Sequence, residues 1–184
     1  MQIGFYFNQS RCTGCYTCTI ACKDWHDIRD GSVHWRRVIP LEKGTYPDVS
    51  LSYISLSCNH CERPLCSEAC PAGAITKREE DGIMVVDQAQ CLGKDMCEMF
   101  CRQACPYEMP QFGTEENPKM QMCTLCLDRF LESKKPICVD ACPMRALDAG
   151  PIDDLKRKYG DLKDVEGFVC SAETNPSIIF KKRY

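Results

Sequence analysis

The chain has 184 residues, a formal net charge of −3 and 17 cysteines, about 9 % of its length. Leu, Ile, Val and Phe together make up only about 20 % of it, the lower limit for a domain that an apolar core alone stabilises. We therefore expect the cysteines to hold the fold together. No apolar run approaches the roughly 18 residues that a membrane span requires, and the first residues lack the features of an export signal.

The first predicted element is a short β-strand at residues 3–7, which are mostly apolar and aromatic. A first cysteine group with the spacing C-x2-C-x2-C-x3-C follows this strand and consists of Cys12, Cys15, Cys18 and Cys22. Bacterial ferredoxins use this spacing to present three thiolates to one iron-sulfur cluster, while the fourth cysteine reaches a second cluster.

The second cysteine group has the spacing C-x2-C-x4-C-x3-C and consists of Cys58, Cys61, Cys66 and Cys70. Residues 74–77 and 83–87 then flank a turn sequence that contains Gly82. Two short apolar segments on either side of such a turn predict a β-hairpin.

The third group, C-x5-C-x3-C-x3-C, consists of Cys91, Cys97, Cys101 and Cys105. The fourth group, C-x2-C-x11-C-x3-C, consists of Cys123, Cys126, Cys138 and Cys142. Beyond it, acidic residues follow Pro151 and basic residues precede Gly160, which predicts a short helix between them. Residues 177–180 predict a last strand, which we expect to lie beside residues 3–7.

Three chemistries can use this many cysteines: disulfide bonds, zinc sites and iron-sulfur clusters. Disulfides need an oxidising compartment, and zinc sites usually join two short pairs across a spacer of about a dozen or more residues. Here each group of four ends in two variable residues followed by Ala and Cys, and a proline follows in three of the four groups. This repeat predicts four [4Fe-4S] clusters with sixteen cysteine ligands, which leaves Cys170 over.

Cluster binding changes the charge of the chain. Sixteen thiolates add 16 negative charges and four oxidised cores contribute 8 positive ones, so the net charge falls from −3 to about −11. We expect no nucleic acid partner for a chain this acidic.

The spacing alone leaves open whether neighbouring or nested groups share their clusters. The sequence contains no Gly-rich phosphate loop and no histidine metal triad, so we expect no catalytic site.

Several segments resemble the iron-sulfur (beta) subunit of dimethyl sulfoxide reductase and related molybdopterin oxidoreductases. They are residues 4–15 (GFYFNQSRCTGC), 21–25 (ACKDW), 57–62 (SCNHCE), 77–79 (KRE), 135–138 (KPIC) and 145–153 (RALDAGPID). The resemblance implies a non-catalytic subunit that serves anaerobic respiration. Such a subunit carries electrons between a large catalytic subunit with a molybdenum or tungsten bis-pterin and a quinone-linked membrane anchor or another redox partner. A free polyferredoxin is the alternative function.

The resemblance also implies that the first group shares clusters with the fourth, and the second with the third. The implied ligands are Cys12, Cys15, Cys18 and Cys142 for cluster 1; Cys22, Cys123, Cys126 and Cys138 for cluster 2; Cys58, Cys61, Cys66 and Cys105 for cluster 3; and Cys70, Cys91, Cys97 and Cys101 for cluster 4. Cluster 1 is implied to lie nearest the catalytic subunit and cluster 4 farthest from it.

An α+β fold of two ferredoxin-like modules follows from the same resemblance, with short β-hairpins and helices wrapped around the clusters. Residues 50–111 are expected to form an inserted module that holds clusters 3 and 4. Residues 1–49 and 112–184 are expected to form the outer module that holds clusters 1 and 2.

The third group departs from the family pattern, because its span is four residues longer than C-x2-C-x2-C-x3-C. Counted from its end, all four cysteines remain and the insertion lies between Cys91 and Cys101. Counted from Cys91, Lys94 takes a ligand position, and cluster 4 is incomplete, absent or a three-iron form. We favour four ligands, because the residues after Cys105 continue the family pattern in register. We expect the changed loop to suit cluster 4, or its surface, to a different electron partner.

Three further residues carry hypotheses. His60 lies between two cysteines and is a candidate hydrogen-bond donor to a cluster sulfur, or a packing residue. Arg36 and Arg37 are candidates for anchoring the acidic chain to its partner, or ordinary surface arginines. Because the chain has no signal of its own, we expect it to be cytoplasmic or to cross the inner membrane with its catalytic partner.

Overall fold

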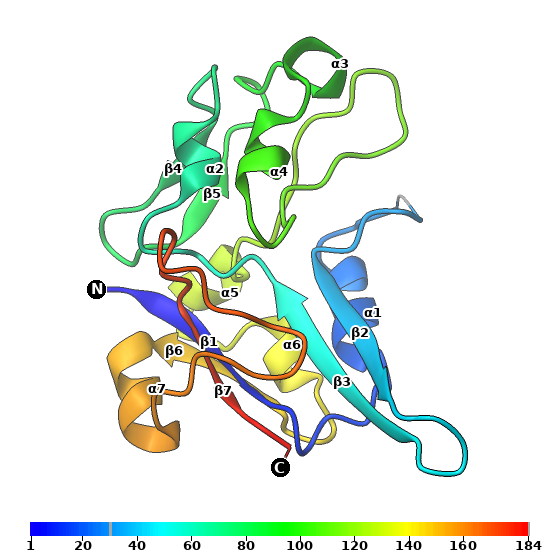
Figure 1. Cartoon of the computed structure of the whole chain (residues 1–184). Coiled ribbons are helices and arrows are strands. Elements are labelled where there is room, and N and C mark those ends of the chain that lie inside the picture. The colour runs from blue at the N-terminus through cyan, green and yellow to red at the C-terminus, as the bar shows by residue number, and fades with distance from the viewer. Residues whose placement is uncertain (30, 184) are drawn as a thin grey trace.

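The computed structural model describes residues 1–29 and 31–183. Its central element is a three-stranded sheet in the order β6-β1-β7. β1 (Ile3–Asn8) pairs antiparallel with β6 (Leu147–Pro151) and parallel with β7 (Ile178–Lys181). Every residue of β1 is buried, because this strand lies in the middle of the sheet. The strands predicted at residues 3–7 and 177–180 are confirmed, and they lie side by side (Figure 1).

α7 (Ile152–Tyr159) packs against this sheet. The Tyr159 ring stacks on the Tyr6 ring with their centroids 3.7 Å apart, and Leu155 is buried beside them. Acidic residues occupy the first turn of α7 and basic residues its last turn, which complements the helix dipole. The helix ends at Gly160, whose φ of 89° few other residues adopt. The helix predicted before Gly160 is confirmed.

Asp148 on β6 joins the sheet to α7. Its carboxylate accepts hydrogen bonds from the Tyr159 hydroxyl at 2.9 Å and from the Lys158 ammonium at 3.2 Å, and it pairs with Lys135 at 2.9 Å. Burial acts to raise the pKa of this carboxyl, but the hydrogen bonds from Lys135 and Tyr159 outweigh burial and hold the pKa below its usual range. The folded protein therefore favours the charged form of Asp148.

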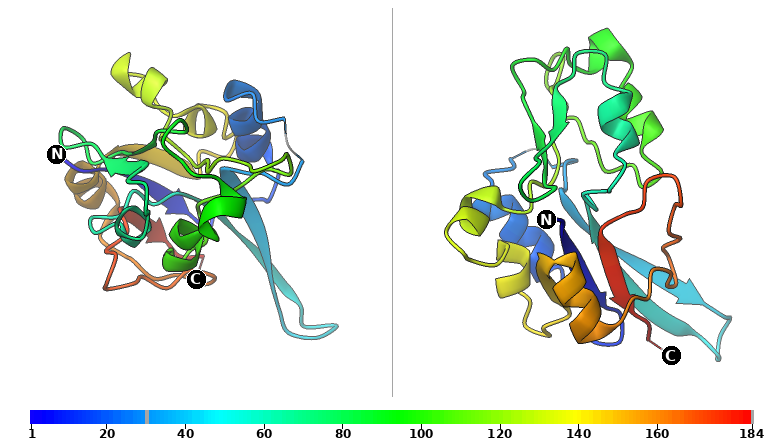
Figure 2. Two further views of the ribbon diagram at one scale, coloured as in Figure 1. Left: turned by 90° about the horizontal axis from the view of Figure 1, so that it is seen from above. Right: turned by 90° about the vertical axis from the view of Figure 1, so that its left-hand side faces the viewer.

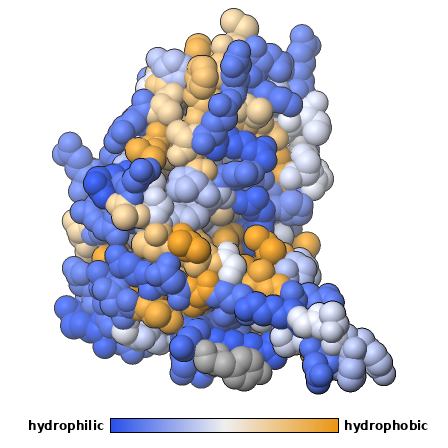
Figure 3. All heavy atoms as spheres, viewed as in Figure 1, coloured by the Kyte–Doolittle hydropathy of each residue, from blue (hydrophilic) through white to orange (hydrophobic). Residues whose placement is uncertain are grey.

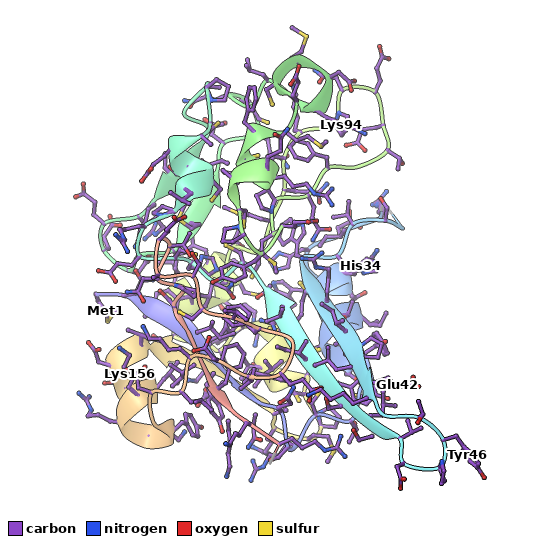
Figure 4. All side chains as sticks on the ribbon, viewed as in Figure 1. Met1, His34, Glu42, Tyr46, Lys94 and Lys156 are labelled. Atoms are coloured by element: carbon purple, nitrogen blue, oxygen red, sulfur yellow. The ribbon has the colours of Figure 1, made fainter. Side chains whose placement is uncertain are left out.

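β2 (Arg36–Lys43) and β3 (Ser50–Ser57) form a long antiparallel hairpin that projects from the molecule (Figures 1 and 2). Tyr46 lies at its tip (Figure 4). At the opposite end of the hairpin, Arg36 pairs with Ser57 and both residues are buried. This hairpin was not predicted, and the expected module boundary at residues 49 and 50 falls between its two strands. The division into two modules stays a prediction.

The segment from α2 to α4 forms the upper end of the molecule in Figure 1. Its elements are α2 (Leu65–Glu68), β4 (Ile75–Lys77), β5 (Met84–Val86), α3 (Lys94–Cys97) and α4 (Phe100–Ala104). β4 and β5 pair antiparallel, so the predicted hairpin is confirmed. The rest of the molecule holds the central sheet with α1 (Thr17–Trp25), α5 (Leu127–Leu131) and α6 (Ile137–Asp140).

The buried core combines aromatic side chains, such as Phe5, Phe7 and Phe180, with many of the cysteines. Short helices and strands surround these cysteines, so the fold is α+β. On the face in Figure 3, apolar atoms gather over the upper end and across the middle of the molecule. In the described part of the chain, no helix has the length and apolar character needed to cross a membrane.

Candidate metal centres

None of the 17 cysteines forms a disulfide, and sixteen of them gather in four sets, which we call the first to the fourth quartet. Each quartet combines cysteines from segments that are distant in the sequence. The structure brings together the same residues that the family resemblance groups. Cys170 has Lys163 and Asp164 as charged neighbours, and the burial of its thiol raises its pKa.

The first quartet lines an apolar pocket and consists of Cys12, Cys15, Cys18 and Cys142. Three of these residues lie on or before the first turn of α1, and the fourth follows α6. Gly14 turns the loop with a φ of 71°, and a Cβ atom at this position would clash with the Tyr53 ring. Cys15 is exposed, and a hydrogen bond from Thr17 lowers the pKa of its thiol. One edge of this quartet is therefore open to a partner.

The second quartet is fully buried and consists of Cys22, Cys123, Cys126 and Cys138. It forms because α1 packs against α6, which brings Cys22 to Cys138. Burial raises the pKa of Cys126 to about 12 and that of Cys138 to about 11. The His26 Nε2 atom lies 3.3 Å from the Cys126 sulfur, a contact that the sequence did not indicate.

The third quartet consists of Cys58, Cys61, Cys66 and Cys105. It forms where α2 packs against α4, because Cys66 lies on α2 and Cys105 directly follows α4. Burial raises the pKa of Cys61 to about 11 and that of Cys66 to about 12. The Thr174 side chain, from the segment before β7, lies beside Cys61 and acts to lower the pKa of this thiol.

The fourth quartet lines an apolar pocket and consists of Cys70, Cys91, Cys97 and Cys101. The lengthened loop between Cys91 and Cys101 forms α3, and this short helix carries Cys97 to the pocket. Lys94 begins the same helix, and its side chain is exposed at the upper end of the molecule (Figure 4). Cys91, Cys97 and Cys101 of the third group thus lie together with Cys70 of the second group, and the Lys94 side chain is exposed.

The chemistry of these sites fits [4Fe-4S] clusters. Burial raises the pKa of most of the thiols, so bare thiolates are unfavourable in this interior, whereas a cationic cluster core compensates their charge. Main-chain N–H groups donate to three sulfurs at 3.3 to 3.4 Å: Met120 to Cys91, Leu125 to Cys123 and Ala146 to Cys142. Within residues 1–29 and 31–183, no three His, Cys, Asp or Glu side chains are arranged to hold a single metal ion.

The quartets follow one another in numerical order through the molecule. Cys138 of the second quartet lies close enough to Cys18 of the first for their charges to interact. The charges of Cys58 in the third quartet and Cys123 in the second also interact. Cys66 of the third quartet lies near Cys101 of the fourth in the same way. Each quartet is therefore close enough to the next for charges on their cysteines to interact.

Arg36 is not a surface residue, because only 2 % of its surface is exposed. The hypothesis that it anchors the chain to a partner is therefore wrong. Arg37 is partly buried, and its guanidinium donates to the main-chain oxygens of Tyr107 at 3.1 Å and Glu108 at 3.3 Å. These hydrogen bonds hold Arg37 within the chain.

His60 is completely buried between the sheet and the third quartet. Its Nδ1 atom accepts a hydrogen bond from the Met84 N–H at 3.0 Å, which assigns the ring proton to Nε2. Burial lowers the pKa of His60 to about 3, so the ring is neutral. Among the described residues, the Nε2 atom has no hydrogen-bond partner. Donation from this atom to a cluster sulfur stays a prediction.

Comparison with known proteins places this geometry in a family. A family described as 4Fe-4S dicluster domain matches residues 49–152. The B subunit of the anaerobic dimethyl sulfoxide reductase of Escherichia coli K12 is 46 % identical over 98 % of this chain and 88 % of its own length. The arsenate respiratory reductase iron-sulfur subunit of Shewanella sp. ANA-3 is 30 % identical over 88 % of this chain and 87 % of its own length.

A third relative, the thiosulfate reductase electron transfer subunit of Salmonella typhi, is 34 % identical over 80 % of this chain and 74 % of its own length. These relatives are iron-sulfur or electron-transfer subunits of reductases, not their catalytic subunits. Their similarity extends over most of this chain, and the match to the dicluster domain indicates that the chain binds [4Fe-4S] clusters. The chain therefore belongs to the iron-sulfur (beta) subunits of the dimethyl sulfoxide reductase family, which transfer electrons and have no catalytic site of their own.

Proposed function

We propose that the chain binds four [4Fe-4S] clusters, numbered as the quartets, and relays electrons through them. One end of the relay meets a catalytic subunit that holds a molybdenum or tungsten bis-pterin. The other end meets a quinone-linked membrane anchor or another redox partner. Each cluster supplies a one-electron carrier when bound. The chain itself supplies sixteen thiolates, apolar pockets that exclude water, and N–H donors to sulfur.

The observation that carries this proposal is the unbroken succession of quartets. Charge interactions between Cys18 and Cys138, between Cys58 and Cys123, and between Cys66 and Cys101 link each quartet to the next. Electron tunnelling requires carriers that are close together, and this succession supports a single path from the first quartet to the fourth. Two separate pairs of clusters that did not exchange electrons would not need the second and third quartets to lie close together.

Both ends of the path support docking of a partner. Beside the first quartet, Cys15 is exposed together with the apolar side chains of Tyr16 and Met144. We assign this end to the catalytic subunit, following the family resemblance. At the opposite end, the exposed apolar residues close to the fourth quartet are Leu92, Met96 and Phe100. We assign these residues to the second redox partner.

The lengthened loop contributes part of that second surface. Met96 lies on α3, the helix that the insertion forms, and it is 72 % exposed. A methionine this exposed adds an adaptable apolar contact at the point where electrons enter or leave. We propose that the insertion keeps four cysteine ligands for cluster 4 and changes the surface that its electron partner contacts.

Anaerobic purification from the native host, with a tag on this chain, tests the proposal. We expect a large pterin-containing subunit in stoichiometric amount and about 16 iron and 16 sulfide per chain. Fractionation of the same cells is expected to place the chain in the compartment that contains the pterin subunit.

Two outcomes of this purification would count against parts of the proposal. Recovery of the chain alone, fully loaded with iron, would instead support a free polyferredoxin. An iron content near 12 per chain would instead support a three-cluster protein with cluster 4 lost.

A further inference from the structure

Arg36 is among the largest fully buried side chains in the protein and carries a permanent positive charge. It lies at the start of β2, where the hairpin enters the core. Its guanidinium lies over the Phe5 ring, 4.5 Å from the centroid. Burial of an unpaired charge is costly, so a buried arginine needs negative groups or hydrogen-bond acceptors around it.

The acceptors of Arg36 are two serines on the facing strand. Its Nη1 atom donates to the Ser55 hydroxyl at 3.2 Å, and its Nη2 atom donates to the Ser57 hydroxyl at 2.8 Å. Ser55 and Ser57 share one face of β3, because side chains alternate along a strand. Within the described part of the chain, the Nε atom has no hydrogen-bond partner. The N–H of this Nε atom is thus left for a group at the cluster sites.

Each serine leads to a cysteine of a different quartet. The Ser55 hydroxyl lies 3.6 Å from the Cys18 sulfur of the first quartet. The Ser57 side chain lies beside Cys123 of the second quartet and acts to lower the pKa of that thiol. Arg36 therefore lies between the first and second quartets, with one serine side chain between it and each.

The negative groups that face Arg36 are thiolates. Burial acts to lower the pKa of Arg36, but the charges of Cys138, Cys18 and Cys123 outweigh burial and raise it. The effect is reciprocal, since the charge of Arg36 opposes the burial that raises the pKa of Cys138. Cys22 contributes in the same way, so three of the four groups belong to the second quartet.

We propose that Arg36 is a positioning residue for electron transfer, whose fixed charge favours the reduced state of cluster 2. This inference rests on the proposed function. Reduction adds one negative charge to the second quartet's site, and a buried cation stabilises the added charge because little water screens it. Arg36 thereby raises the reduction potential at this step of the path. The hydroxyls of Ser55 and Ser57 hold the guanidinium in place.

Two substitutions separate the charge of Arg36 from its packing. Arg36→Gln removes the charge and keeps a polar side chain, whereas Arg36→Lys keeps the charge and loses the two-pronged hydrogen bonding. Arg37→Gln is the matched control, because it removes the same charge from the next residue of β2. The Arg37 guanidinium lies against the main-chain oxygens of Tyr107 and Glu108 instead.

The measurement is a redox titration of the anaerobically purified complex, followed by electron paramagnetic resonance, with iron content determined in parallel. For Arg36→Gln we expect the reduction equilibrium of one cluster to shift at least tenfold toward the oxidised state, or ~59 mV for one electron. We expect Arg36→Lys to shift it less. The Arg37→Gln control is expected to leave that cluster at the wild-type potential.

Wild-type potentials in an Arg36→Gln variant with full iron content would overturn the inference and leave the proposed function intact. If Arg36→Gln loses iron, the Arg36→Lys variant decides. Full iron content with a potential near the wild-type value in Arg36→Lys supports the role of charge. Loss of iron in Arg36→Lys as well overturns the inference. A wild-type complex without four reducible clusters would instead refute the proposed function.

Discussion

The third cysteine group allows a decisive test, because Cys97 and Lys94 compete for one ligand position. Cys97 is one of four sulfurs around the fourth pocket, whereas the Lys94 side chain is exposed three residues away on the same short helix. Cys97→Ser leaves three thiolates at the site. We expect the iron content to fall from about 16 to about 15 per chain if a three-iron cluster remains, or to about 12 if the cluster is lost.

Lys94→Met is the matched control for this prediction. The main-chain N–H of Lys94 donates to the Pro118 oxygen at 3.0 Å, and the substitution leaves this hydrogen bond in place. The side chain is exposed, so the free energy of unfolding should change by less than about 0.5 kcal/mol and the iron content should stay near 16. Colorimetric iron and sulfide assays on anaerobic protein give the comparison. Loss of iron in Lys94→Met, with full iron in Cys97→Ser, would refute the four-cysteine assignment.

Three further substitutions test the fold around the sites. Asp148→Asn should reduce the free energy of unfolding by about 1–2 kcal/mol near neutral pH. Because the folded pKa of Asp148 is lowered, this difference should be present above pH ~3.9 and disappear as the pH falls through the folded pKa, measured by urea denaturation. Leu155→Ala should lower the free energy of unfolding by about 2–5 kcal/mol in the same assay, since Leu155 is on the buried face of α7. Gly14→Ala should lower the iron content through its clash with Tyr53, whereas Gly31→Ala, which has open space around it, should not.

Local patterns in the sequence were sufficient for the elements whose residues interact with near neighbours. The hairpin of β4 and β5 follows from two short apolar segments around a turn, and α7 follows from its charge pattern and Gly160. The strand at residues 3–7 was also clear, because its apolar residues are buried on both faces.

The hairpin of β2 and β3 was missed because residues 50–57 do not alternate strictly: Ser50 and Ser52 fall on one face of the strand, and Ser55 and Ser57 fall on the other. Ser55 and Ser57 face Arg36 and the cysteines, so this side of the strand is polar and does not resemble the apolar side of an ordinary half-buried strand. Residue statistics also place arginine at the surface, which is why the burial of Arg36 could not be foreseen.

Spacing identified the cysteine groups but could not pair them. A spacing reports which sulfurs a loop can present together, whereas the pairing depends on which helices pack. Cys22 meets Cys138 only because α1 packs against α6, and that contact joins residues more than a hundred positions apart. The family resemblance supplied this information, and the arrangement of the quartets agrees with it.

The central claim is that one chain carries four clusters in succession, and stepwise reduction under argon with spin quantification tests it most directly. We predict uptake of about four electrons per chain. Because cysteines of neighbouring quartets lie close enough for their charges to interact, the spectra of the reduced protein should show spin-spin interaction between clusters. Uptake of two electrons or fewer, four isolated signals without interaction, or zinc in place of iron would contradict the account.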